Sequence, residues 1–349
     1  MKEIKDKYLI VGQGLAGSIL AFLLRKNKIP FKIIDNAHHQ ASSKVAAGIF
    51  NPMVFMRYAE SWLAPELIPT MEELIQEIEI LLNEKLIHHL PMKKIFPNEE
   101  DKRFWIQKSE SRPFLGGVEE NTKEGSMIMP FGYGIVKKTG YVDLEKLLDG
   151  LKNIFQKEET LINEVFDYEK IEFENELVFY KGIPYEGIIF CEGYQVMKNP
   201  FFNKLPYKHT KGEVLDINTS EEIDKSCIYN KKMFMLPTSN NNFKIGSTYD
   251  WNNLDFEKTN EAIDFLTEKL AVFFEGKYTI AQHKVGIRPT MKDRRPVIGN
   301  HPEYKNLYIF NGWGSKGVLL IPYFAKQMLA FLNSDDYEKL HPEVRLNRF

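Results

Sequence analysis

The strongest constraint on the fold lies in the N-terminal part of the chain, up to Asp35. A short apolar run, Tyr8–Val11, is followed by a GxGxxG motif over residues 12–17, by apolar side chains at helical spacing, and by a second apolar run that ends at Asp35. An uninterrupted apolar run is typical of a strand buried on both faces of a parallel sheet. The order strand, glycine turn, helix, strand and acid is the one that a dinucleotide-binding unit requires.

Each glycine of this motif has its own physical role. Gly12 permits the tight turn out of the strand, Gly14 lets a pyrophosphate approach the backbone, and Gly17 lets the helix pack closely on the strand. The phosphates would lie at the helix N-terminus, where free N–H groups and the helix dipole favour anions. Asp35, 18 residues after Gly17, can accept hydrogen bonds from a ribose and would repel a 2'-phosphate. The unit predicts an adenine dinucleotide other than NADP, leaves FAD and NAD open, and has a ligand-free glycine turn as its alternative.

Composition excludes several other classes of protein. The formal net charge of -2 gives no overall positive field that would attract nucleic acid or an anionic membrane. Neither the two cysteines nor the eight histidines have the spacing of metal ligands, so we predict no metal site. Residues 1–7 are too polar for a signal peptide, and no apolar run approaches the ~20 residues of a membrane span. A cytoplasmic protein is the resulting expectation.

The middle of the chain carries weaker signals. Helical spacing of apolar residues predicts helices at 66–87, after Asp143 and at 257–275, while short alternating runs around 160–180 predict a small antiparallel meander. The apolar run that ends at Glu192 and Gly193 predicts another buried strand. Residues 91–140 read as strands and loops without a sharp signal.

A second constellation of motifs lies near the C-terminus. It comprises a GIRP run at 286–289, a PVIG run at 296–299, an apolar strand at 307–310, the sequence NGWGSKG at 311–317 and a helix at 318–332. Here again a strand passes through glycines into a helix N-terminus, which predicts a second site for an anion or a carbonyl group. Such a terminus, placed against the pyrimidine part of a flavin, would stabilise negative charge on the reduced ring.

With these motifs the sequence resembles the FAD-dependent D-amino acid oxidase superfamily, especially its glycine oxidase and sarcosine oxidase branches. The resemblance covers nearly the whole chain and rests on both glycine turns, the GIRP and PVIG runs, Asp35, Ser43, Gly193 and residues 211–213. It implies an α/β fold: a Rossmann-like FAD-binding domain, with a parallel sheet and an antiparallel meander, into which a mainly antiparallel α+β substrate domain is inserted. The expected FAD-binding domain comprises residues 1–85, 140–205 and 286–349, and the substrate or cap domain comprises 86–139 and 206–285.

The resemblance also implies which residues contact the cofactor. The expected FAD-binding residues are Gly12, Gly14, Gly17, Asp35, Ser43, Ala47, Gly48, Val165, Gly193, Gly314, Ser315, Lys316, Gly317 and Val318. Because the C-terminal run contains no cysteine, we expect FAD to be bound non-covalently. The stretch from Asn51 to Trp62 departs from the glycine oxidase pattern, and it lies where the chain would pass near the active site.

Two further residues are expected to act on the substrate or on oxygen. Arg288 matches the arginine that pairs with a substrate carboxylate, since a guanidinium offers a two-pronged fork for that group; a structural salt bridge, for example to Asp293, is the alternative. Lys244 loosely matches the lysine that activates oxygen in the sarcosine oxidase branch, and a solvated strand lysine is the alternative. Tyr249 and His283 are candidates for the pocket wall.

The expected function is oxidation of a C–N bond in a small amino acid or secondary amine, by hydride transfer to flavin N5. The imine then hydrolyses, and oxygen or another acceptor reoxidises the flavin. One alternative is the flavin domain of a tRNA-modifying oxidase, which the near-neutral charge disfavours. Another is a non-catalytic nucleotide-binding protein. The substrate, its stereochemistry and the oligomeric state are left open.

Overall fold

The N-terminal strand, β1 (Tyr8–Val11), forms the middle of a six-stranded sheet in the computed structural model, which describes residues 5–36, 41–56, 58–120, 122–239 and 241–349. The first four residues of the predicted polar start lie outside the described part. The strands of this sheet are, in spatial order, β13 (Leu161–Ile162), β2 (Phe31–Ile34), β1, β17 (Gly187–Phe190), β24 (Leu307–Asn311) and β23 (Val297–Asn300). All neighbours are parallel except β23 and β24.

Both faces of this sheet are covered, which explains the uninterrupted apolar run in β1. Tyr8 and Ile10 belong to the apolar cluster that the sheet forms with the helices. Leu9 and Val11 point to the opposite face and pack in a separate cluster with side chains of the meander. Alternate residues of a strand point to opposite faces, so a strand between two layers has no polar face.

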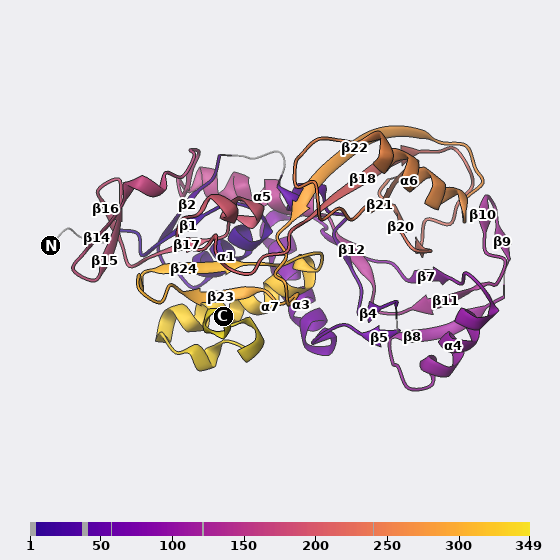
Figure 1. The fold of residues 1–349 in the computed structure, drawn as a ribbon, viewed down its shortest axis with the longest axis horizontal. Helices are drawn as coiled ribbons and strands as arrows, with labels where there is room; N and C mark the ends of the chain where they lie inside the picture. The colour runs from indigo at the N-terminus through magenta and orange to yellow at the C-terminus, as the bar shows by residue number, and fades with distance from the viewer. Residues whose placement is uncertain (1–4, 37–40, 57, 121, 240) are drawn as a thin grey trace.

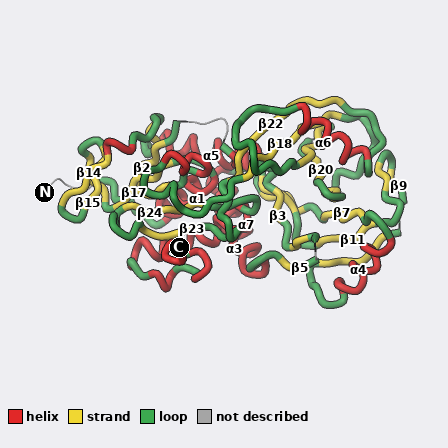
Figure 2. The backbone as a smooth tube through the Cα atoms, viewed as in Figure 1, coloured by secondary structure: helices red, strands yellow, loops and turns green. Residues whose placement is uncertain are grey.

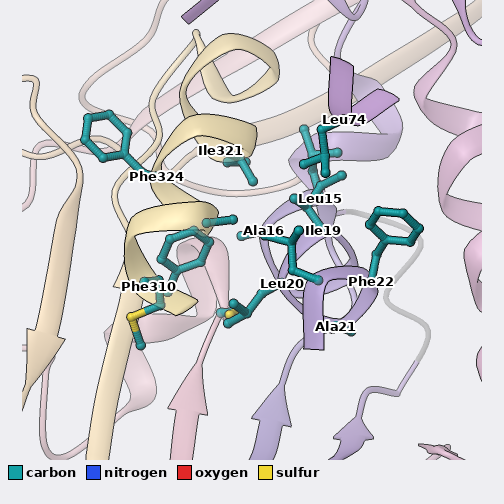
Figure 3. Close-up of a cluster of buried hydrophobic side chains, with 14 of the residues drawn as sticks. Leu15, Ala16, Ile19, Leu20, Ala21, Phe22, Leu74, Phe310, Ile321 and Phe324 are labelled. Atoms are coloured by element: carbon teal, nitrogen blue, oxygen red, sulfur yellow. The ribbon is translucent and has the colours of Figure 1, made fainter. Parts of the chain in front are cut away.

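Four helices make up one of these layers: α1 (Leu15–Lys26), α3 (Ala64–Leu82), α5 (Leu144–Lys157) and α7 (Gly317–Ser334). Ile19 and Leu20 of α1 lie in one buried cluster with Ile321 of α7 and Phe310 of β24 (Figure 3). The first and last helices of the fold thus pack together, which brings the two ends of the chain into one layer.

The meander forms the opposite layer. Its strands are β14 (Ile171–Glu174), β15 (Leu177–Tyr180) and β16 (Ile183–Tyr185), and they pair antiparallel in sequence order. Val178, Tyr180 and Tyr185 are buried in the cluster that includes Leu9 and Phe190 of the parallel sheet.

An eight-stranded sheet dominates the other lobe of the molecule (Figures 1 and 2). Its strands are, in order, β22 (Thr279–Arg288), β18 (Thr210–Asn218), β21 (Asn242–Gly246), β20 (Phe234–Pro237), β19 (Ile228–Asn230), β7 (Met92–Ile95), β11 (Tyr133–Val136) and β8 (Leu115–Glu119). Only the β19–β7 pair is parallel among the paired strands of this sheet in the described residues. Helix α6 (Asn260–Ala271) packs Leu266 and Leu270 against this sheet.

Smaller elements join the two lobes or lie at their edges. They are α2 (Ser42–Val45), α4 (Glu99–Ser109), the sheet of β3 (Ile49–Phe50), β12 (Gly140–Val142) and β6 (Ile87–His89), the pair β4 (Met53–Val54) and β5 (Ala59–Glu60), and the pair β9 (Lys123–Glu124) and β10 (Met127–Ile128).

The predicted fold class is confirmed, and the differences are local. The helix expected after Asp143 is α5, and the Asp143 carboxylate caps it by accepting a hydrogen bond from the Lys146 N–H (3.1 Å). Helix α4 lies in the segment that was expected to form strands and loops. Only Trp105 of its residues is buried, so the sequence shows no helical repeat of apolar residues there. The domain boundaries stay a prediction, and β22 runs across the one proposed between residues 285 and 286.

Within the described residues, we find no helix that combines the length and the apolar character needed to cross a membrane.

Candidate active site

A cavity of about 500 Å³ lies between the parallel sheet and the eight-stranded sheet. The carboxyl ends of β1 and β17 meet it through Gly12 and Cys191, and strands β18 and β22 face it through Gly212 and Arg288. Ligands of open α/β sheets bind in the crevice beyond the carboxyl ends of the strands. The topology therefore puts this cavity where a dinucleotide is expected.

The glycines of the first turn shape one wall of the cavity. Gly12 has φ of +102°, and a Cβ there would lie 2.7 Å from the Cys191 carbonyl oxygen. A Cβ on Gly17 would lie 1.9 Å from the Gly12 carbonyl oxygen, so the helix could not approach the strand as it does. At Gly14 a Cβ would meet only the Ser43 hydroxyl, at 3.6 Å, which leaves the backbone open to a ligand.

Asp35 and Ser43 hold the turn in place. The Gln13 N–H donates to Oδ2 of Asp35 (2.8 Å), and the Leu15 N–H donates to Oγ of Ser43 (3.1 Å). The N-cap residue of helix α1 is Gly14, which has no side chain to cap the helix, and the first turn contains no acidic residue; Gly14 and Ala16 line the cavity there. Its N-terminus thus presents a positive dipole end to the cavity.

Val165 and Gly193, which the resemblance also assigns to FAD binding, line the same cavity. Gly193 has φ of +58°, a conformation that suits glycine. The neighbouring Glu192 carboxylate accepts hydrogen bonds from the Tyr168 hydroxyl and from the Asn199 amide (2.8 Å). Burial raises the pKa of Glu192 to about 7.

The C-terminal glycine turn forms another part of the same wall. The predicted residues Gly314, Ser315, Lys316, Gly317 and Val318 all line the cavity, together with Ala47 and Gly48 from the other end of the chain. Helix α7 starts there, also without a side-chain cap or an acidic residue in its first turn. Two positive helix ends therefore meet one cavity, and this arrangement fits FAD, which carries a diphosphate and a polar pyrimidine edge.

Lys316 adds a titratable cation to this wall. Its ammonium donates to the Ser61 hydroxyl and has no ion-pair partner among the described residues. Burial lowers the pKa of Lys316 to about 8. Lys316, which the resemblance places in the flavin turn, thus lines the cavity and carries a buried cation.

Arg288 lies on the part of the wall that the eight-stranded sheet provides. Its Nη2 donates to the Ser247 hydroxyl (2.6 Å), and its Nη1 lies within hydrogen-bonding range of the Lys211 (3.4 Å) and Thr248 (3.3 Å) carbonyl oxygens. A Cβ on Gly212 would lie 2.2 Å from Nη2, so a glycine is needed for the guanidinium to fit. Burial lowers the pKa of Arg288 from its usual range.

The alternative salt bridge of Arg288 to Asp293 is not formed. Asp293 instead binds Arg348, with 3.0 Å between Oδ2 and Nε. Arg288 has no ion-pair partner within the part of the chain that the structure describes. Its guanidinium also lies against the ring of Tyr249, whose centroid is 4.4 Å from the guanidinium carbon. Tyr249 lines the cavity as expected.

The structure does not bring Lys244 or His283 to the cavity wall. The register of β18 and β21 pairs Lys244 with Asp216, and its Nζ lies 2.9 Å from the Asp216 carboxylate. Nε2 of His283 lies 2.7 Å from the Glu213 carboxylate. The oxygen-activating role expected for Lys244 therefore has no support from its position, because a carboxylate on its own sheet already holds the ammonium.

Several lining residues were not singled out from the sequence. Ser247, Asn230 and Phe234 line the wall that the eight-stranded sheet provides, and no motif marks them. Met53 and Phe55 also line the cavity; they belong to the stretch that departs from the glycine oxidase pattern. No group of three or more metal-ligating side chains occurs in the described residues.

Residues 7–331 match the DAO family, which is described as FAD dependent oxidoreductase. The chain belongs to this family. It is thus an FAD-dependent oxidoreductase, and the expected cofactor is confirmed at the level of the family.

Curated relatives and solved structures agree with this assignment. The chain is 24% identical to the tRNA 5-methylaminomethyl-2-thiouridine biosynthesis bifunctional protein MnmC of Legionella pneumophila, over 94% of this chain and 54% of that protein. This chain therefore spans about half the length of that curated relative. The iminodiacetate oxidase of Chelativorans sp. BNC1 superposes with a TM-score of 0.80, 18% identity and coverage of 97% and 99% of the two chains. The glycine oxidase of Geobacillus kaustophilus superposes with a TM-score of 0.76, 19% identity and 95% coverage of each chain.

Proposed function

We propose that this enzyme oxidises the C–N bond of an α-amino carboxylate whose carboxylate group is bound by Arg288. The observation that carries the proposal is the unpaired guanidinium of Arg288 on the cavity wall, without an acidic partner in the described residues. Burying a charge without a counterion is costly. A carboxylate ligand would supply that counterion and would match the planar fork of the guanidinium.

The chain's own residues would bind and orient the substrate. Arg288 would hold the carboxylate and so fix the neighbouring Cα–H bond of the substrate relative to the flavin ring. Ser247 and the Lys211 and Thr248 carbonyl groups hold the guanidinium in turn. Bound FAD supplies the hydride acceptor. The substrate loses a hydride from Cα and a proton from nitrogen, and water then hydrolyses the imine to a carbonyl compound and an amine.

The names of the solved relatives support a glycine-like substrate. One is named for glycine and the other for iminodiacetate, which is a glycine that carries a second carboxymethyl group on nitrogen. Lys316 is consistent with this class, because a second cation on the cavity wall favours an anionic substrate. N-substituted glycines are therefore the class to test first.

The test is anaerobic reduction of the FAD-loaded enzyme by glycine, sarcosine and iminodiacetate, followed as loss of flavin absorbance near 450 nm. We expect Arg288→Ala to raise KM for the active substrate about 100-fold, which corresponds to the ~3 kcal/mol lost when one partner of a buried charge pair is removed. Arg288→Lys should recover part of this loss, since it keeps the charge without the fork.

Lys244→Met serves as the matched control, since it removes a cation that is bound to Asp216 outside the cavity wall. We expect it to leave flavin reduction and reoxidation by oxygen unchanged. Unchanged KM in Arg288→Ala would contradict the carboxylate role. A protein that stays colourless when FAD is added would contradict the oxidoreductase assignment as a whole.

A second candidate function is oxidation of a modified base in tRNA. The similarity to the MnmC protein extends over 94% of this chain, whereas the similarity in sequence to the Pseudomonas putida glycine oxidase covers 34%. The net charge of -2 argues against tight RNA binding. The test is whether bulk tRNA shifts the mobility of the protein at low salt and reduces its flavin, with single-stranded DNA as the control polyanion. Flavin reduction by tRNA but not by the three amines would replace the first proposal with this one.

A further inference from the structure

The segment from Ser247 to Phe256 borders the cavity and carries two exposed aromatic side chains. Ser247, Tyr249 and Phe256 line the cavity. Tyr249 and Trp251 are 54% and 53% exposed, and their rings stack with centroids 6.2 Å apart and an angle of 28° between their planes. Exposed aromatic residues are common singly, but here two neighbours form one surface that begins at the cavity wall and continues into solvent.

This surface is held in place by the fold. The Asp250 carboxylate accepts hydrogen bonds from the backbone of Asn252 (2.8 Å) and Asn253 (3.2 Å), which fixes the turn around Trp251. The Lys211 ammonium, which is almost fully buried, binds Asp255 (2.6 Å). Backbone hydrogen bonds between Lys211 and Asp250 in both directions (2.8 and 3.0 Å) attach the same turn to β18. A pre-ordered aromatic surface loses little entropy when a flat ligand stacks on it.

The position of Tyr249 relates this surface to the substrate. The Tyr249 ring lies against the Arg288 guanidinium, 4.4 Å from its central carbon. In an α-amino carboxylate bound to Arg288, the nitrogen lies one carbon away from the carboxylate. A substituent on that nitrogen would therefore lie within a few bonds of Tyr249 and, beyond it, of Trp251.

We propose that Tyr249 and Trp251 form the binding surface for a planar ring carried by the nitrogen substituent of the substrate. The inference rests on the proposed function, and it narrows the substrate class to N-substituted glycines with an aromatic or heteroaromatic group. Stacking on exposed aromatic side chains supplies affinity for flat rings of many kinds. Saturated groups of equal size gain only the apolar contact.

The experiment uses the FAD-loaded chain and two inert ligands, (benzylthio)acetate and (methylthio)acetate, whose binding is followed by perturbation of the flavin spectrum. We expect the benzyl compound to bind more tightly, and Trp251→Ala to weaken it about tenfold, as loss of one stacking partner does. Binding of the methyl compound should not change. Trp251→Phe should restore most of the difference, and (cyclohexylmethylthio)acetate should be less sensitive to Trp251→Ala than the benzyl compound.

Phe173→Ala is the matched control, because Phe173 is also exposed (42%) and stacked, on Tyr304, but neither ring of that pair lines the cavity, whereas Tyr249 does. Equal effects of Trp251→Ala on the benzyl and methyl compounds, or no effect on either, would overturn the inference. The same comparison by flavin reduction uses N-benzylglycine and sarcosine. If neither reduces the flavin while the inert ligands still show the stacking difference, the proposed reaction fails and the binding surface stands.

Discussion

Arg288 and Lys316 both line the cavity, but they differ in how their charges respond to pH. Arg288 stays protonated throughout the accessible range, because a guanidinium is not deprotonated in proteins. Lys316 does titrate in that range, since burial lowers its pKa to about 8. The two residues can therefore be distinguished experimentally by the pH dependence of ligand binding.

We predict that an inert carboxylate ligand binds more weakly as the pH rises through about 8. Lys316 is charged below this pH and neutral above it, and only the charged form attracts an anion. Between pH 7 and pH 9 the dissociation constant of (methylthio)acetate should rise about threefold to fourfold, which is most of the fivefold difference that ~1 kcal/mol for one charge-assisted hydrogen bond would give. Flavin spectral titration at each pH measures it.

Two variants separate Lys316 from other titrating groups. Lys316→Met should bind the ligand about as weakly at pH 7 as the wild type does at pH 9, with no further change. Lys316→Arg should stay charged and show constant affinity. A wild-type affinity that does not vary with pH would exclude the contribution of Lys316.

At the scale of elements, the N-termini of α1 and α7 lie on one cavity, and two glycines at the start of α1 differ in role: Gly14 precedes the helix and Gly17 lies in its first turn. Gly17 is needed for the contact of helix and strand, because its Cβ would lie 1.9 Å from the Gly12 carbonyl oxygen. Gly14 has no such clash within the protein. Its role must then concern what approaches from the cavity.

We therefore predict opposite phenotypes for two alanine variants. Gly17→Ala should lower the melting temperature of the FAD-free protein despite the better helix propensity of alanine, which is worth about 1 kcal/mol. Gly14→Ala should change the free energy of unfolding by less than about 1 kcal/mol but weaken FAD binding at least tenfold. Thermal unfolding and FAD titration of both variants give the comparison. Normal FAD affinity in Gly14→Ala would show that the diphosphate does not approach this glycine.

The glycine turns in front of α1 and α7, with their flanking strands, could be predicted from the sequence. The strand-turn-helix units at both ends combine apolar runs with glycines whose spacing depends only on local geometry. Lys244 shows the limit: its strand could be read, but its partner Asp216 is set by the register between β18 and β21. Tyr249 could be named only as a candidate, and Ser247 not at all, because the return of β22 beside β18 is what places Arg288 against them.

At the scale of the whole molecule, the cavity joins parts of the chain that are far apart in sequence. Gly14 and Gly48 come from the first segment, Gly193 from the middle, and Arg288 and Gly317 from the last. The parallel sheet and the eight-stranded sheet each contribute to the wall. A ligand that fills this cavity therefore contacts both lobes at once and couples their stability.

We predict that FAD raises the unfolding temperature of both lobes together. A ligand that binds only the folded state stabilises it by about 2.7 kcal/mol at 100 times its dissociation constant. Hydrogen exchange is the suitable measurement, because it reports separately on β1 and β24 in the parallel sheet and on β18 and β22 in the other. Protection should increase in both sets with FAD, whereas ADP, which lacks the flavin, should protect mainly the parallel sheet. An equal pattern with both ligands would mean that the eight-stranded sheet does not contact the flavin part of the cofactor, and the placement of Arg288 beside the reacting group would then be wrong.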